Sequence, residues 1–161
     1  TTMSDLDYPA CISELYQSEV LGEAAFLALI KVAKNEREKY HFGTLLQLET
    51  ETKARLRPFL FRHGLALDES QGDGEVVSGF LALYQDNDWI DFLAQLKPMI
   101  DQFVTRFREI AEAGPPGDKA ILESMIRHEE SYVHWIQKET AGEEGALDVA
   151  LSQIQYPLSA P

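Results

Sequence analysis

The feature that most constrains the fold is a carboxylate placed in the middle of an apolar helical face. In the stretch 125–136, positions 125, 126, 133 and 136 are apolar, and Glu129 and Tyr132 lie on the same face at helical spacing. Burying a carboxylate is unfavourable unless something pairs with it. We therefore expect this helix to face a polar centre inside a helical fold.

Two other segments show the same anomaly. Glu19 and Glu23 interrupt the apolar stripe over residues 12–30, and Glu49 interrupts the stripe over residues 42–59. Three helices that each direct a carboxylate inward indicate a bundle with a polar centre. We therefore expect Glu19, Glu49 and Glu129 to converge in the interior.

The remaining periodicity and the helix-ending residues predict the rest of the architecture. We expect one all-α domain, 1–161, with a short helix over 76–84 that packs across the bundle end. The long connection 65–88 can cross the bundle, whereas antiparallel neighbours need only a few linking residues. Pro58 and Pro98 should kink or divide their helices. The four long helices are expected at about 9–35, 38–63, 88–113 and 118–141, and a short final helix at 143–155.

Charge and cysteine content restrict the function and the compartment. The formal net charge of −13 argues against non-specific binding to nucleic acid or to an anionic membrane. No apolar run is long enough to span a bilayer. The single cysteine, Cys11, permits no internal disulfide, which favours a reducing, cytoplasmic location.

The carboxylate-bearing segments resemble known metal-binding helices. In helical bundles that hold two metal ions, two helices each supply a Glu and the other two each supply Glu-x-x-His. The segment 125–136 resembles the fourth-helix motif of the ferritin-like superfamily, particularly bacterioferritin and rubrerythrin, and 46–53 resembles the other such motif. The resemblance places Glu129 and Glu49 at the Glu positions, with Tyr132 and Thr52 where the histidines are expected. It implies a ferritin-like bundle with its crossover between the second and third long helices.

The resemblance also implies iron or manganese as the cofactor, at an altered site. The candidate metal ligands are Glu19, Glu49, Glu129, Glu23 and His128. We favour a surface or boundary position for His128, with an inward, metal-binding position as the alternative. Glu23 is either a ligand, a hydrogen-bond partner of Tyr132, or a residue at a water-filled edge. On the third long helix, no acid occupies 96–99, where the resemblance expects one.

Three functions remain open at this point. The first is a ferritin-like binding or structural protein without metal chemistry. In that case Lys53 or, alternatively, Arg106 neutralises the carboxylates, and the partner is a second copy or a ferritin-like subunit. The second is an iron- or manganese-dependent oxidoreductase or hydroxylase. The third is iron storage, which the loss of both motif histidines disfavours. We expect no nucleic-acid or membrane partner.

Overall fold

The computed structural model describes residues 6–70 and 74–161, and this part of the chain is helical, without strands. The all-α prediction is therefore confirmed. A 3-10 turn, Pro116–Asp118, precedes α5. The α-helices are α1 (Tyr8–Lys31), α2 (Glu36–Arg62), α3 (Glu75–Gln85), α4 (Trp89–Ala113), α5 (Lys119–Thr140) and the short α6 (Asp148–Leu151).

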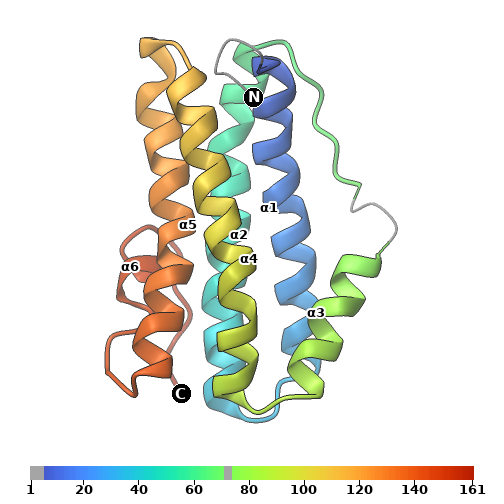
Figure 1. Ribbon diagram of the computed structural model, residues 1–161, viewed down its shortest axis with the longest axis vertical. Coiled ribbons are helices and arrows are strands. Elements are labelled where there is room, and N and C mark those ends of the chain that lie inside the picture. Colours follow the sequence, from blue (N-terminus) through green and yellow to red (C-terminus); the bar gives the residue numbers. More distant parts are fainter. Residues whose placement is uncertain (1–5, 71–73) are drawn as a thin grey trace.

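The four long helices form two hairpins that pack into a bundle. α1 packs mainly on α2, and α4 packs mainly on α5. Figure 1 shows that α2 and α4 run in the same direction, so the connection between them returns along the length of the bundle. The predicted long connection thus joins the two hairpins, and α2 and α4 are not linked by a tight turn.

Side-chain caps explain where three of the long helices begin. Asp7 accepts a hydrogen bond from the amide of Ala10, and Asn35 accepts one from Glu38. Asp88 accepts from the amide of Asp91 at 2.8 Å. Each cap satisfies an amide that the first helical turn leaves without a partner.

Several boundaries differ from the predicted ones. α1 ends at Lys31, and the predicted final helix shrinks to α6 because Gly142 and Gly145 adopt positive φ angles of 69° and 82°. α3 packs along α1 rather than across the bundle end (Figure 1). Pro58 and Pro98 lie within continuous helices. Both prolines are exposed, so water can reach the carbonyl groups that lose their partners.

The hydrophobic core has two parts, and the polar centre lies between them. One part contains Phe42, Phe92 and Trp135, and the other contains Ile12 and Phe107. The helices hold the central polar residues 19, 49, 52, 128 and 129 between these two parts. None of the described helices is long and apolar enough to cross a membrane.

Candidate metal centre

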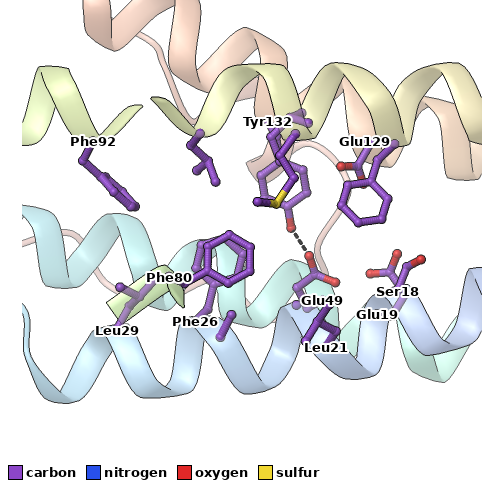
Figure 2. Close-up of a pocket in the computed structure, with 16 residues that line it drawn as sticks. Ser18, Glu19, Leu21, Phe26, Leu29, Glu49, Phe80, Phe92, Glu129 and Tyr132 are labelled. Atoms are coloured by element: carbon purple, nitrogen blue, oxygen red, sulfur yellow. Dashed lines mark hydrogen bonds between the residues drawn. The ribbon is translucent and has the colours of Figure 1, made fainter. Parts of the chain in front are cut away.

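Three helices bring carboxylate and imidazole groups together in the interior. Glu19 of α1, Glu49 of α2 and His128 of α5 are buried, and one ligand atom of each lies within 4.8 Å of those of the other two. Nε2 of His128 is 2.8 Å from Oε2 of Glu19 and 3.8 Å from Oε2 of Glu49. Figure 2 shows the Glu19 and Glu49 carboxyl groups facing each other, with Glu129 on the opposite wall.

The converging atoms are buried without hydrogen-bond partners. Oε2 of Glu19, Oε2 of Glu49 and Nε2 of His128 have no hydrogen bond of acceptable geometry, although Nε2 and the Glu19 oxygen are close. Most buried polar atoms in proteins are paired, so three unpaired atoms in one place require an explanation. A cation between them would satisfy all three, and the group could therefore hold a metal ion.

His128 faces inward, so the favoured prediction of a surface or boundary position is wrong. Its side chain has no exposed surface, and Nδ1 lies 3.3 Å from Oγ1 of Thr52. That contact orients the ring with Nε2 towards the carboxyl groups. The error came from the helical register: the buried face of α5 centres on Met125, His128 and Tyr132, whereas Ile126 is only partly buried.

Glu49 is held by its two neighbouring helices. Tyr132 donates a short hydrogen bond to Oε1, which leaves Oε2 free to face His128. Phe26 stacks on the Tyr132 ring at 5.8 Å between centroids. A Cβ at Gly22 would lie 2.5 Å from the Glu49 carboxyl carbon, so only glycine allows the approach. The sequence analysis did not single out Gly22, although a glycine one turn after Glu19 and next to Glu23 was a visible signal.

Burial shifts the central groups towards their neutral forms. It raises the pKa of Glu19 to about 8, and the charge of Glu129 adds to this effect. Burial also raises the pKa of Glu49 and of Glu129 well above the ordinary range. It lowers the pKa of His128 to about 4, so this imidazole is neutral and keeps a free lone pair at neutral pH. A bound cation would reverse the shifts of the carboxyl groups.

Glu129 lies beside the group of three rather than within it. It is 6% exposed and lines the same internal cavity as Glu19 and Glu49. The predicted burial and convergence of the three carboxylates is therefore observed. No described side chain donates a hydrogen bond to Glu129, which leaves it available as a further oxygen ligand or a proton acceptor.

The basic residues proposed as charge partners lie elsewhere. Lys53 is buried, but its Nζ contacts Glu23 at 3.0 Å and Glu69 at 2.5 Å rather than the central carboxyl groups. Glu23 also accepts from Thr50 at 2.6 Å, so it does not bond to Tyr132 as one alternative expected. Glu23 is thus engaged in an ion pair outside the group of three.

The two arginines nearest the centre behave differently. Arg106 pairs with Glu14 at 2.8 Å on the partly exposed side of α4, so the expectation that it neutralises the centre is wrong. Arg55, which the sequence reading missed, is half-buried, and its charge lowers the pKa of Glu19. Its Nε is buried and unpaired, so Arg55 offers only partial compensation to the carboxyl groups.

A mostly apolar cavity of about 60 Å³ adjoins the carboxyl groups. Most of its lining residues come from α1 and α4, and Phe80 of α3 and Tyr132 of α5 complete the lining (Figure 2). No protein-family model, no curated protein and no solved structure matches this chain. Function must therefore be inferred from the geometry of the site.

Proposed function

We propose that this chain binds one divalent transition-metal ion, iron or manganese, through Glu19, Glu49 and His128. The observation that carries the proposal is the convergence of three buried ligand atoms, none of which has a hydrogen bond. Two carboxylates with one neutral imidazole form a donor set that suits iron, manganese or zinc.

Neighbouring side chains would hold the ligands in position. Tyr132 fixes one oxygen of Glu49 and turns the other towards the centre. Thr52 contacts Nδ1 of His128, which directs Nε2 inward. Such indirect contacts orient metal ligands and usually change metal affinity by about 10- to 100-fold when removed. Thr52 and Tyr132 thus support the site from positions where the resemblance expected histidines.

The arrangement of the long helices supports a ferritin-like bundle, with the whole chain as one domain. Two antiparallel hairpins joined by a long crossover agree with that architecture. In this proposal His128, the residue before Glu129, supplies the imidazole that position 132 lacks. A redox-active iron or manganese ion would supply oxidoreductase chemistry, and the mostly apolar cavity beside the carboxyl groups supports such an activity over iron storage.

A metal-free structural bundle is the second candidate. Burial raises the pKa of both Glu19 and Glu49, and their carboxyl groups face each other, so a proton shared between them would hold the pair together without metal. The Tyr132 hydrogen bond to Glu49 stabilises the same arrangement without metal. In that case the chain acts as a binding protein or a partner subunit.

Metal binding can be tested with metal-free protein prepared in a chelator and then dialysed anaerobically against Fe(II) or Mn(II). We expect about one ion per chain in the wild type and at least a 100-fold weaker affinity in His128→Gln and in Glu49→Gln. His41→Gln is the matched control, because His41 is also buried but accepts a hydrogen bond from Trp135 at 2.9 Å and lies outside the group.

The variants separate the two candidates. If wild type and His128→Gln take up equally little metal after anaerobic reconstitution, the metal-free bundle is correct. If both bind one ion with the same affinity, the metal lies at another place and the proposed ligands are wrong.

A further inference from the structure

A groove lies between the two helical hairpins, along the line where α1 faces α4. α1 packs on α2 and α3, and α4 packs on α5, which leaves the space between α1 and α4 incompletely filled. Most of its walls are apolar, and Figure 2 shows Phe26 and Leu29 along one side. The remaining apolar wall includes Leu21 and Ala25 of α1 and Leu96, Met99 and Ile100 of α4.

The groove joins the solvent to the carboxyl groups. Met99 is 36% exposed and Leu21 is partly exposed, so the groove opens to the surface between them. At the inner end, Glu49 and Glu129 line the enclosed part. A molecule that enters between α1 and α4 therefore ends its path beside the proposed metal ligands.

The volume and the apolar lining of the groove restrict which molecules it can bind. Apolar cavities of about 150 Å³ stay dry and accept benzene. The enclosed volume here, about 60 Å³, is less than half of that size. It is too small to enclose a six-membered ring, whereas an unbranched chain can place its end there and lay its remaining carbons along the open part of the groove.

We propose that this groove binds the end of an unbranched aliphatic chain and places it beside Glu19 and Glu49, the two carboxylate ligands of the proposed metal centre. The aliphatic compound would be the substrate of the metal centre, so this role rests on the proposed function. Chain binding itself requires no metal, because the apolar walls alone supply the driving force.

Binding can be measured by titrating metal-free protein with 1-butanol, 1-pentanol and 1-hexanol while following backbone amide shifts by NMR. Each further methylene that enters the groove should tighten binding about fourfold. Cyclohexanol, which has the carbon count of 1-hexanol but a ring, should bind at least tenfold more weakly than 1-hexanol. Equal affinity along the series, or equal affinity for cyclohexanol and 1-hexanol, would overturn the proposal.

A longer alcohol distinguishes the two possible sources of the chain. If 1-octanol binds more tightly than 1-hexanol by the same factor per methylene, the natural ligand is the end of a long chain that extends outward between α1 and α4. If affinity stops rising beyond 1-hexanol, the ligand is a small aliphatic molecule. Both results support the unbranched chain as the ligand class.

Two variants locate the binding site. Ala25→Leu fills the groove and should weaken 1-hexanol binding at least tenfold, whereas Ala24→Leu makes the same change on the same helix outside the groove and should not. Met99→Trp covers the exposed opening and decides the question if Ala25→Leu fails to fold. Wild-type affinity in a folded Ala25→Leu variant, or in Met99→Trp, would place the binding elsewhere.

Measurements on Co(II)-loaded protein test the position of the chain end independently of whether the metal centre exists. In Co(II)-loaded protein, 1-hexanol should change the visible absorption bands of the ion, because the chain ends beside its ligands. Bound alcohol with unchanged Co(II) bands would overturn the placement of the chain end. If Co(II) does not bind at all, the proposed metal centre fails, while the titrations of the metal-free protein still decide whether the groove binds aliphatic chains.

Discussion

Two buried carboxyl sites in this protein contain the same residue types in opposite electrostatic states. At one end of the bundle, Asp118 is 5% exposed and accepts hydrogen bonds from Tyr8 at 2.7 Å and from Arg62 at 2.8 Å. Nε2 of His63 is 2.9 Å away. Burial alone would raise the pKa of Asp118, but these three partners outweigh it and leave the pKa below its usual value.

The centre of the bundle also combines carboxyl groups with a histidine, a tyrosine and a nearby arginine. Here the polar atoms of Glu19, Glu49 and His128 that face one another remain unpaired, and Arg55 is only half-buried beside them. The pKa values of both carboxyl groups are raised and that of His128 is lowered. In the metal-free fold, the neutral form of all three side chains is therefore favoured at neutral pH.

The comparison shows what a structural carboxylate needs and what the centre lacks. Asp118 has a donor for each oxygen, so it stabilises the junction of α1, α2 and α5 without further help. Glu19 and Glu49 are as deeply buried, but the Oε2 atom of each has no such donor. We infer that the central group is arranged for a cation rather than for stability alone.

The largest expected effect is an opposite response of the two sites to pH: the stability that Asp118 contributes is lost as pH falls, because its folded pKa is lowered, whereas the centre loses stability as pH rises. Between pH 4.5 and about 8, metal-free folded protein keeps a proton on Glu19 that the unfolded chain has released. The free energy of unfolding should therefore fall as pH rises through this window, by about 4 kcal/mol at pH 8 if Glu19 dominates. Urea unfolding in the presence of a chelator measures it.

Two controls test whether the pH response arises from the central carboxyl group: the Glu19→Gln variant and added Mn(II). Glu19→Gln should flatten the slope, and added Mn(II) should reverse it, because a bound cation favours the ionised carboxylate. Below pH 6.5 His128, whose folded pKa is about 4, opposes this trend, because the unfolded chain takes up a proton there that the fold excludes. The slopes of Glu19 and His128 then nearly cancel, so the fall in stability should be clearest between about pH 6.5 and 8. A stability that rises steadily from pH 5 to 8 without metal would contradict the assigned burial.

Removing the structural carboxylate should be the next largest change. Asp118→Ala removes the acceptor of the Tyr8 and Arg62 hydrogen bonds, but Arg62 is 56% exposed and water can solvate it, so we expect a loss of about 2 kcal/mol in the free energy of unfolding. Asp101→Ala, which breaks an exposed pair with Lys97, is the control and should change stability by less than about 0.5 kcal/mol. Equal effects in the two variants would remove the contrast between the sites.

Neutralising a central carboxyl group should have the opposite sign. Glu19→Gln removes a group whose charged form is disfavoured, so metal-free protein at pH 7.5 should gain about 1 kcal/mol of stability. The same variant should bind Mn(II) more weakly than the wild type. Thermal unfolding with and without Mn(II) measures both effects. A destabilised metal-free variant would show that the Glu19 carboxyl contributes an essential structural hydrogen bond.

The smallest expected effect concerns Lys53. Its partners Glu23 and Glu69 are 29% and 49% exposed, so water can solvate both carboxylates when the lysine is removed. Lys53→Met should lower stability by only about 1 kcal/mol and leave Mn(II) affinity unchanged. Chemical denaturation and a metal titration check this. A loss of 3 kcal/mol or more would restore the view that Lys53 neutralises the central carboxylates.

Helical periodicity sufficed to predict the helices and the burial of Glu19, Glu49 and Glu129, because each acid interrupts an otherwise apolar stripe. Periodicity could not decide whether His128 faces the interior. A shift of the assumed buried face by one residue moves this side chain from a boundary position to a buried one. The partners of Lys53 were also unpredictable, since Glu69 reaches it from the crossover segment, whose path depends on tertiary packing.

Other parts of the site depend on contacts between helices. Gly22 matters because α1 and the Glu49 carboxyl approach each other closely, a distance that no local pattern encodes. The groove beside Met99 likewise results from how the two hairpins meet, rather than from the sequence of either one.

The most direct test of the central claim is anomalous X-ray diffraction at the manganese edge from crystals grown with Mn(II) and without chelator. We expect one strong peak among Glu19, Glu49 and His128, at about 2.0–2.2 Å from Nε2 and a similar distance from the carboxylate oxygens, as in other protein metal sites. A density map with the two carboxyl groups bonded to each other and no anomalous peak between them would contradict it.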